Sequence, residues 1–143
     1  MYEDTLARVD LFKGLEKKDL RILAASCQER KYPAGSTLIK QGDTGVGLYV
    51  IISGKVRITQ ANNPDRAEEE LDVMGAGSVL GEMALLDDLP RSATVTALED
   101  VTALLLPVWE FRTTLQSHPD IAVRLLAVLS RRLRKAENRS YDN

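Results

Sequence analysis

Residues 29–107 consist of short apolar runs separated by clusters of turn-forming residues, and this pattern constrains the fold more strongly than any other feature of the chain. In one run Val56 and Ile58 alternate with polar neighbours, as expected for a strand with one buried face and one wet face. The predicted strands are Ser36–Lys40, Leu48–Ile52, Lys55–Gln60, Glu70–Met74, Ala93–Ala97 and Thr102–Leu106. Several short strands at this spacing predict an antiparallel β-roll or barrel.

Two connections between these strands have a recognisable signature. Ser53 and Gly54 separate two predicted strands and are typical of a two-residue β-hairpin turn. The polar segment Ala61–Glu69 predicts a hairpin tip in water, and a docking role for its acidic residues is the alternative.

Helical periodicity precedes and follows the strand region. The stretch Glu16–Cys27 predicts a helix, because its apolar residues recur at i, i+3, i+4 and i+7: Leu20, Leu23, Ala24 and Cys27. Cys27 is the only cysteine, so it cannot form an intramolecular disulfide, and its place on this stripe predicts a small core residue. Two further helices are predicted, over Val108–Ser117 and from Pro119 to about Asn138.

The last predicted helix has an apolar surface broad enough to contact two partners. Its main stripe comprises Ala122, Leu126, Leu129, Leu133 and Ala136, and a second flank comprises Ile121, Leu125 and Val128. Such a helix is expected to contact its own roll and, in addition, a ligand or a second subunit. A homodimer through Ala122, Leu126, Leu129 and Leu133 is therefore one prediction.

The same helix also carries a run of cations near its predicted end. These are Arg131, Arg132, Arg134, Lys135 and Arg139. Cations at a helix C-terminus complement the helix dipole, and we interpret the run in that way rather than as a DNA-binding tail.

Length and charge narrow the class of protein. At 143 residues and 15.8 kDa the chain fits one domain, predicted to span residues 1–143. Lys and Arg number 19 against 21 Asp and Glu, so the net charge of -2 provides no general attraction to nucleic acid. The sequence has neither an apolar run of membrane-spanning length nor a signal-like N-terminus. A cytoplasmic protein without membrane contact is expected, and the lone cysteine suits a reducing compartment.

The segment Gly81–Ala93, GEMALLDDLPRSA, carries most of the functional information. Met83–Leu86 favours one helical turn, whose first N–H groups lack partners within the turn and suit an anion. Arg91 follows a proline and offers a planar set of donors that fits two phosphate oxygens. Glu82 would accept hydrogen bonds from a sugar hydroxyl on the same ligand. The alternative interpretation is a surface ion pair between Glu82 and Arg91.

This segment resembles the phosphate-binding cassette of the cyclic nucleotide-binding domain family. The matching residues extend over nearly the whole chain: Gly35, the Gln41-Gly42-Asp43 turn, the stretch Leu48–Val56, Gly77, the stretch Gly81–Leu86 and the stretch Pro90–Ala93. The family includes the sensor domains of catabolite activator-type regulators, the regulatory subunits of cyclic-AMP-dependent kinase and cyclic nucleotide-gated channels. A Gly-Glu pair alone would be a weak signal, whereas the full cassette among predicted strands is a strong one.

The resemblance implies a mainly β fold with flanking helices (α+β). Its eight-stranded antiparallel β-roll, of jelly-roll type, would occupy 29–107, with the cassette at 81–93. Helices would occupy 1–28 and 108–139, the latter forming a hinge and a lid over the base. The implied ligand is cyclic AMP or cyclic GMP, with cyclic AMP favoured because it is the more frequent ligand in the family.

The resemblance also assigns roles to individual residues. Glu82 would bind the ribose 2′-hydroxyl, Arg91 the cyclic phosphate, and Ser92 the phosphate or the base. Gly81, Met83 and Ala84 would donate or frame backbone contacts. The residues implied to line the base and sugar pocket are Val73, Leu80, Ala93 and Val95.

Two departures from the family pattern stand out. Leu80 occupies the position where the family often has Phe, which is expected to alter packing rather than binding. Asp87 and Asp88 add negative charge near the phosphate site, and we expect both to face water because inward-facing carboxylates would weaken anion binding.

The favoured function is a regulatory binding module without catalysis, which changes conformation on ligand binding and acts on an unidentified effector protein. It would need no cofactor, metal or catalytic residue. One alternative is the sensor fragment of a transcription regulator, because the family's DNA-binding members carry a helix-turn-helix domain after the long helix and this chain stops at Asn143. The chain alone is then not expected to read DNA sequence.

Two other classes of protein are alternatives. In the first, the cassette no longer binds nucleotide and serves as a protein-interaction module. In the second, the chain is a metal enzyme of the cupin type, which would need clustered histidines and carboxylates. The only histidine, His118, stands beside Pro119 in a predicted helix connection, which argues against the metal enzyme.

Overall fold

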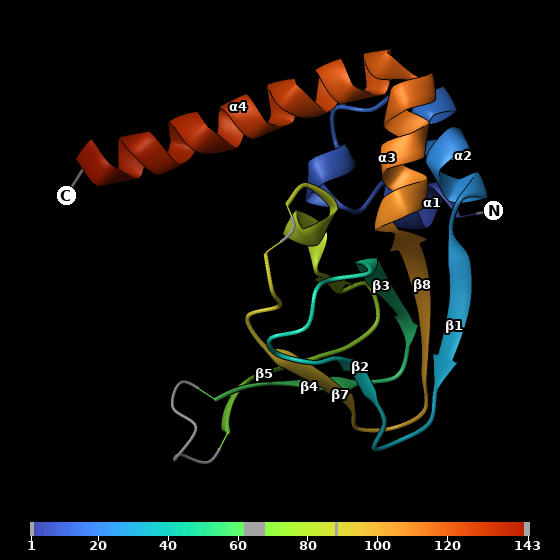
Figure 1. Cartoon of the computed structure of the whole chain (residues 1–143), viewed down its shortest axis with the longest axis vertical. Coiled ribbons are helices and arrows are strands. Elements are labelled where there is room, and N and C mark those ends of the chain that lie inside the picture. Colours follow the sequence, from blue (N-terminus) through green and yellow to red (C-terminus); the bar gives the residue numbers. More distant parts are fainter. Residues whose placement is uncertain (1, 62–67, 88, 142–143) are drawn as a thin grey trace. The chain divides into compact units, whose positions relative to one another are not determined.

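The computed structural model describes residues 2–61, 68–87 and 89–141, and it separates into two compact units (Figure 1). One unit comprises residues 27–109 and contains the strands. The other comprises residues 1–26 together with 110–143 and is helical. The prediction of one domain over the whole chain stays a prediction.

The strand unit is an eight-stranded antiparallel roll, as predicted. Its elements are β1 (Gln28–Tyr32), β2 (Thr37–Ile39), β3 (Gly47–Ser53), β4 (Val56–Gln60), β5 (Glu69–Met74), β6 (Val79–Leu80), β7 (Thr94–Ala97) and β8 (Val101–Pro107). They form two four-stranded sheets, in the orders β1-β8-β3-β6 and β2-β7-β4-β5 (Figure 1). Each described strand pair is antiparallel, and the predicted jelly-roll class is confirmed.

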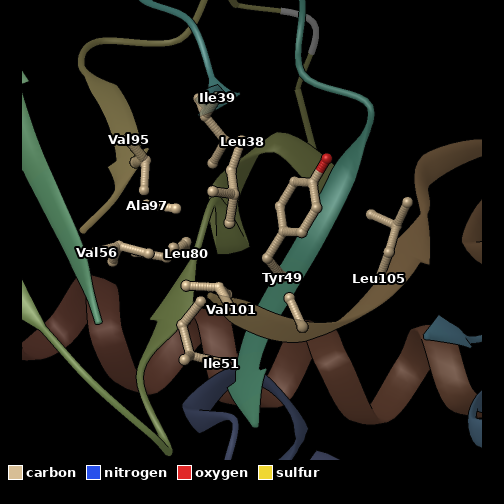
Figure 2. Packing of buried hydrophobic residues seen from close by; sticks show 11 residues of the cluster. Leu38, Ile39, Tyr49, Ile51, Val56, Leu80, Val95, Ala97, Val101 and Leu105 are labelled. Carbon is tan, nitrogen blue, oxygen red and sulfur yellow. The ribbon is translucent and has the colours of Figure 1, made fainter. Parts of the chain in front are cut away.

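The core of the roll lies between the two sheets. Figure 2 shows side chains of both sheets pointing toward one another, with Tyr49 and Ile51 from one sheet and Val56 and Val95 from the other. The predicted alternation in β4 is present, since Val56 is buried while its neighbour Arg57 is exposed. Strand β8 is buried along nearly its whole length, as expected for a strand between two others.

Two strands were absent from the prediction, and one predicted turn is wrong. β1 consists of Gln-Glu-Arg-Lys-Tyr and is mostly exposed, so it lacks the apolar alternation of a strand, and β6 has two residues. Ser53-Gly54 is not a hairpin turn, because β3 pairs with β6 and β8 whereas β4 pairs with β5 and β7. At Gly54, with φ +95°, the chain crosses from one sheet to the other.

The hairpin predicted around Ala61–Glu69 is confirmed by the pairing of β4 with β5. Residues 62–67 of its tip, on which the docking alternative depends, lie outside the described residues.

The helical unit contains α1 (Glu3–Leu6), the 3₁₀ helix η1 (Asp10–Phe12), α2 (Lys17–Ala25), most of α3 (Val108–Ser117) and α4 (Pro119–Tyr141). Its core includes the rings of Phe12 and Phe111, whose centroids are 6.2 Å apart. α3 has the predicted bounds, and α4 ends three residues (141 − 138) beyond the predicted end. Over the described parts of the chain, the helices are too short or too polar to cross a membrane.

The predicted apolar face of α2 is confirmed at Leu20 and Leu23, which are buried. Cys27 lies beyond the end of the helix and is half-buried. Burial raises the pKa of the Cys27 thiol to about 12, so the group stays protonated at neutral pH, as expected for a packing residue rather than a nucleophile.

An ion-pair cluster joins α2 and α4 within the helical unit. The Arg124 guanidinium lies 2.9 Å from Asp19, 3.0 Å from Glu16 and 3.0 Å from Asp120. Asp19 is 1% exposed and also accepts a hydrogen bond of 2.9 Å from the backbone N–H of Glu16 at the start of α2. Arg124 therefore fastens the long helix to the first turn of α2.

Candidate functional site

Gly81 opens the central segment in a left-handed conformation, with φ +74° and ψ +26°. This backbone geometry is readily available to glycine alone, and it turns the chain from β6 into the short 3₁₀ helix η2 (Glu82–Leu85). The predicted helical turn is therefore present, one residue earlier than expected. Ala84 and Leu85 are buried beneath it, and Met83 is 51% exposed.

The loop before β3 holds the other end of the segment. The backbone N–H of Arg91 donates to the Asp43 carbonyl oxygen at 2.8 Å, and the Gly42 N–H donates to the Arg91 carbonyl oxygen at 2.9 Å. Thr44 and Pro90 form an antiparallel bridge beside them. Arg91 thus has a fixed backbone position, although its partners are nearly fifty residues away in the sequence.

The Arg91 side chain is half-buried among glycine backbones. Its Nη2 donates a hydrogen bond to the Gly47 carbonyl oxygen. A Cβ atom at Gly45 would lie 2.6 Å from Arg91 Nε, and one at Gly81 would lie 2.6 Å from Cζ, so both positions need glycine. The guanidinium is therefore half-buried, and not fully exposed as a surface ion pair with Glu82 would require.

Burial lowers the pKa of Arg91, and the nearby Tyr49 and Asp87 partly oppose this effect. The lowered pKa means that removal from water destabilises the charged guanidinium by more than the surrounding groups stabilise it. An anion placed against the side chain would supply the missing compensation.

Two adjoining hollows meet at Arg91. The larger, of about 380 Å³, is lined by Gly81, Glu82, Met83, Ala84, Asp87, Leu89, Pro90, Arg91 and Ser92. The smaller, of about 190 Å³, is lined by Ile39, Ile58, Val79, Leu80, Gly81, Arg91, Ser92, Ala93 and Val95. Gly81, Arg91 and Ser92 belong to both, so a single ligand could lie in a polar compartment and an apolar one.

The hollows bring together the predicted site residues, with one exception. Val73 lines neither of them. It is 47% exposed and pairs across the strands with Arg57, on the face opposite Val56 and Ile58. We therefore leave Val73 out of the binding site, because the strand register points it away from the core.

Asp87 also departs from expectation. It was predicted to face water, but it is half-buried, lines the larger hollow and accepts a hydrogen bond of 3.1 Å from the Leu89 N–H through Oδ1. Its carboxylate belongs to the turn before Pro90. Asp88 lies outside the described residues.

Several residues that hold the site were missed at the sequence level. Gly45 and Gly47 surround the Arg91 guanidinium, and the glycine-rich run Gly42–Gly47 was the signal that could have found them. Gln60 Nε2 donates to the Ser92 carbonyl oxygen at 2.9 Å. The Gln41 side chain exchanges two hydrogen bonds of 2.9 Å with the backbone of Ala61.

Among the described residues, no three His, Cys, Asp or Glu side chains gather closely enough to hold a metal ion. His118 lies at the junction of α3 and α4, where its backbone N–H donates to the Thr114 carbonyl oxygen at 2.8 Å.

Comparison with known proteins identifies similar sequences and structures. The chain is 35% identical over 140 residues to the CRP-like cAMP-activated global transcriptional regulator of Mycobacterium tuberculosis, covering 98% of this chain and 62% of that protein. It is 38% identical over 127 residues to the cyclic AMP receptor protein of Thermus thermophilus, covering 89% of this chain and 58% of that protein. The chain thus spans about three fifths of the length of these relatives.

A solved structure also matches this chain. The N-terminal domain of a transcriptional regulator from Streptomyces coelicolor matches with a TM-score of 0.86 and 38% identity, over 96% of this chain and 95% of that one. The family profile for the cyclic nucleotide-binding domain matches residues 29–118, which contain both hollows and the whole cassette. The chain therefore belongs to the cyclic nucleotide-binding domain family.

Proposed function

We propose that this chain is a cyclic AMP-binding regulatory module, with the cyclic phosphate on Arg91, the ribose 2′-hydroxyl on Glu82 and the base in the smaller hollow. The observation that carries the proposal is the environment of Arg91. Its guanidinium is half-buried at the meeting point of two hollows, and its side-chain hydrogen bond goes to a neutral carbonyl group. A buried cation in this setting favours an anionic ligand.

The phosphate would lie in the larger hollow, between Arg91 and the start of η2. Gly81 allows a close approach there because it has no side chain, and Ser92 lies next to Arg91 on the same wall. Arg91 can offer parallel N–H groups to two phosphate oxygens, which a lysine could not do. A singly charged cyclic phosphate matches a single guanidinium.

Glu82 would bind the sugar. It lines the larger hollow together with Arg91, and its carboxylate oxygens can accept a hydrogen bond from a sugar hydroxyl there. A ribose joined to the phosphate brings its 2′-hydroxyl into this neighbourhood. The pair of residues therefore selects a sugar phosphate over a free phosphate.

The base would occupy the smaller hollow, whose lining is largely apolar. Leu80, Ala93 and Val95 were predicted there, and Ile39, Ile58 and Val79 complete the wall. Such a surface accepts the flat face of a purine and offers few groups that distinguish adenine from guanine. The preference for cyclic AMP rests on the names of the two bacterial relatives, one cAMP-activated and one a cyclic AMP receptor.

The proposed role is regulatory and not catalytic, and no cofactor is invoked. The Mycobacterium relative and the Streptomyces structure are named as transcriptional regulators. The chain matches 62% of the Mycobacterium protein and 58% of the Thermus protein. A role as the sensor part of a transcription regulator is therefore the second candidate function. Action on an effector protein and association with a second copy of the chain belong to this proposal, whereas sequence-specific DNA binding by this chain alone does not.

The homodimer predicted through α4 has a specific observation in its favour. Leu126 and Leu133 of the predicted stripe are 63% and 61% exposed in the isolated chain. Apolar side chains in such positions favour a second helix as a partner. Sedimentation velocity with and without cyclic AMP checks this point; a monomer at every concentration and ligand level would contradict it.

Calorimetric titration of the chain with cyclic AMP and with cyclic GMP tests the proposed function. We expect saturable one-to-one binding, tighter for cyclic AMP, and no binding of adenosine, which lacks the phosphate. Absence of binding at millimolar cyclic nucleotide would reject the proposal and favour the interaction module that no longer binds nucleotide.

A second titration tests the role of Glu82. Glu82→Ala should lower the affinity for cyclic AMP about tenfold, which corresponds to the loss of one hydrogen bond to a charged group. The affinity for 2′-deoxy cyclic AMP should remain nearly unchanged. Met83→Ala is the matched control, because Met83 is an exposed neighbour that is proposed to contribute only its backbone. Equal losses for both nucleotides would show that Glu82 does not contact the 2′-hydroxyl.

A further inference from the structure

A basic hollow lies within the helical unit, between η1 and α4. It has a volume of about 460 Å³ and is lined by Asp10, Lys13, Val128, Arg131, Arg132 and Lys135. Four of these six side chains are cationic and one is acidic, although the chain as a whole has a net charge of -2. The proposed nucleotide site contributes none of its residues to this hollow.

The helix dipole does not account for these cations. Its effect is confined to the last turn of a helix, and α4 continues to Tyr141. Lys135 lies six residues (141 − 135) before that end and Arg131 lies ten (141 − 131) before it. The dipole therefore does not explain Arg131 or Lys135, although it remains the interpretation of the cations nearer the helix end. Arg131 and Lys135 are instead like charges at i and i+4, a spacing that destabilises a helix by itself.

Among the residues that the structure describes, Arg131 and Lys135 have no ion pair with a carboxylate, and Lys13 has one. Asp10 is 3.3 Å from Lys13, and both side chains are mostly exposed, so this ion pair is weak. Arg124, seven residues before Arg131 on the same helix, has three carboxylates within 3.0 Å. Within the described parts of the chain, Arg124 is thus paired with carboxylates, whereas Arg131 and Lys135, further along α4, are not.

One wall of the hollow is closely packed. Val128 is 6% exposed, and a Cβ atom at Gly14 would lie 3.0 Å from Val128 Cγ2 and 3.5 Å from Arg131 Nη2. Gly14 therefore lets the segment after η1 approach α4 closely, beside the cations. The volume falls within the range of sites for small molecules.

We propose that this hollow binds a small polyphosphate anion, such as the phosphate chain of a nucleoside triphosphate, as a second ligand of the protein. Guanidinium groups bind phosphate oxygens in pairs, and ammonium groups act as point charges, so Arg131 with Lys13 and Lys135 forms a mixed receptor for several phosphates. The cations converge on one concavity from elements 118 positions apart (131 − 13), which favours a compact anion over an extended nucleic acid.

Inorganic tripolyphosphate is the probe for this site, titrated by calorimetry into the Arg91→Ala variant so that the nucleotide site is disabled. We expect saturable binding that weakens as the salt concentration rises. Lys135→Ala should weaken it about two- to fivefold, and Arg131→Ala with Lys135→Ala about tenfold or more. Arg134→Ala is the matched control, since Arg134 is an α4 cation outside the hollow, and it should leave the affinity unchanged.

Three outcomes would overturn the proposal: no saturable binding of tripolyphosphate, an equal loss in the Arg134→Ala control, or binding only to chains that retain Arg91. A double-stranded DNA fragment that displaces tripolyphosphate more strongly than ATP, at equal phosphate concentration, would also overturn it in favour of nucleic acid. Cyclic AMP binding by the Lys135→Ala variant, measured in parallel, keeps this result separate from the proposed function. Circular dichroism of each variant shows that α4 remains folded.

Discussion

Arg91 in the strand unit and Arg124 in the helical unit are both half-buried arginines, and their surroundings are opposite. Arg124 lies within 3.0 Å of three carboxylates, and the hydrogen bond to Asp120 is the largest influence raising its pKa. Arg91 donates to a backbone carbonyl oxygen among glycines, and burial is the largest influence, which lowers its pKa.

We interpret the difference as that between a structural cation and a cation proposed to bind a ligand. Where the protein supplies carboxylates, the guanidinium has all the partners it needs and fastens helices together. Where the protein supplies neutral dipoles and a hollow, the cost of taking the charge out of water is left for a ligand to offset. In this account Arg124 contributes stability and Arg91 contributes binding.

The largest expected effect is on ligand affinity at Arg91. Arg91→Ala should weaken cyclic AMP binding by about 1.5–3 kcal/mol, the value of hydrogen bonds to a charged group. This corresponds to about 10- to 150-fold in the dissociation constant. Calorimetric titration measures it, and an unchanged dissociation constant would place the phosphate elsewhere.

The next effect concerns the stability contributed by the Arg124 cluster. Asp19→Ala removes a buried acceptor that serves both Arg124 and the Glu16 N–H, and it should lower the free energy of unfolding by about 1–3 kcal/mol. Asp120→Ala, at a carboxylate that is 52% exposed, should cost less. Urea denaturation of both variants measures the two losses in the free energy of unfolding. Equal losses would show that the burial of Asp19 does not increase its contribution to stability.

A smaller effect concerns the stability of the ligand-free chain. It is expected to have opposite signs at the two arginines, and so it distinguishes their roles. Arg91→Met keeps the volume and removes a desolvated charge, so the free energy of unfolding should be unchanged or higher by about 0–1 kcal/mol. Arg124→Met leaves Asp19 buried without its cation and should lower the melting temperature. Scanning calorimetry compares the two; a larger loss in Arg91→Met would make Arg91 the structural residue.

The smallest effect is a pH dependence confined to the helical unit. The hydrogen bond from Arg124 holds the pKa of Asp120 below its ordinary value of 3.8. A carboxyl group with a lowered pKa stabilises the fold above its ordinary pKa, and this stabilisation disappears as pH falls through the folded-state value. Below pH 3.8, Asp120→Asn should therefore lose less stability than the unmodified chain. Parallel acid titration curves followed by circular dichroism would contradict this expectation.

Strands could be predicted where apolar and polar side chains alternate along the sequence, and they were missed where this alternation is absent. β4 was found because Val56 and Ile58 alternate with polar residues, whereas the polar edge strand β1 and the two-residue β6 lack such a pattern. The turn at Gly54 was assigned to a hairpin because a local signal cannot tell whether the next strand joins the same sheet. Sheet membership depends on contacts with β7 and β8, which are distant in sequence.

The site shows the same limit. The cassette residues Glu82 and Arg91 are close in sequence, and both line the larger hollow as expected. Gly45 and Gly47 were missed because their role is to leave room for a side chain more than forty residues away. Val73 was misplaced because its face depends on the register of β5 against β4, which the sequence pattern of β5 does not reveal.

The shift in melting temperature produced by saturating cyclic AMP tests the central claim most directly, in the unmodified chain, Arg91→Met and Arg124→Met. A ligand that binds only the folded chain raises its melting temperature. We predict a clear upward shift in the unmodified chain and in Arg124→Met, despite the lower starting stability of the latter, and little or none in Arg91→Met. A full shift in Arg91→Met, with none in Arg124→Met, would contradict the account.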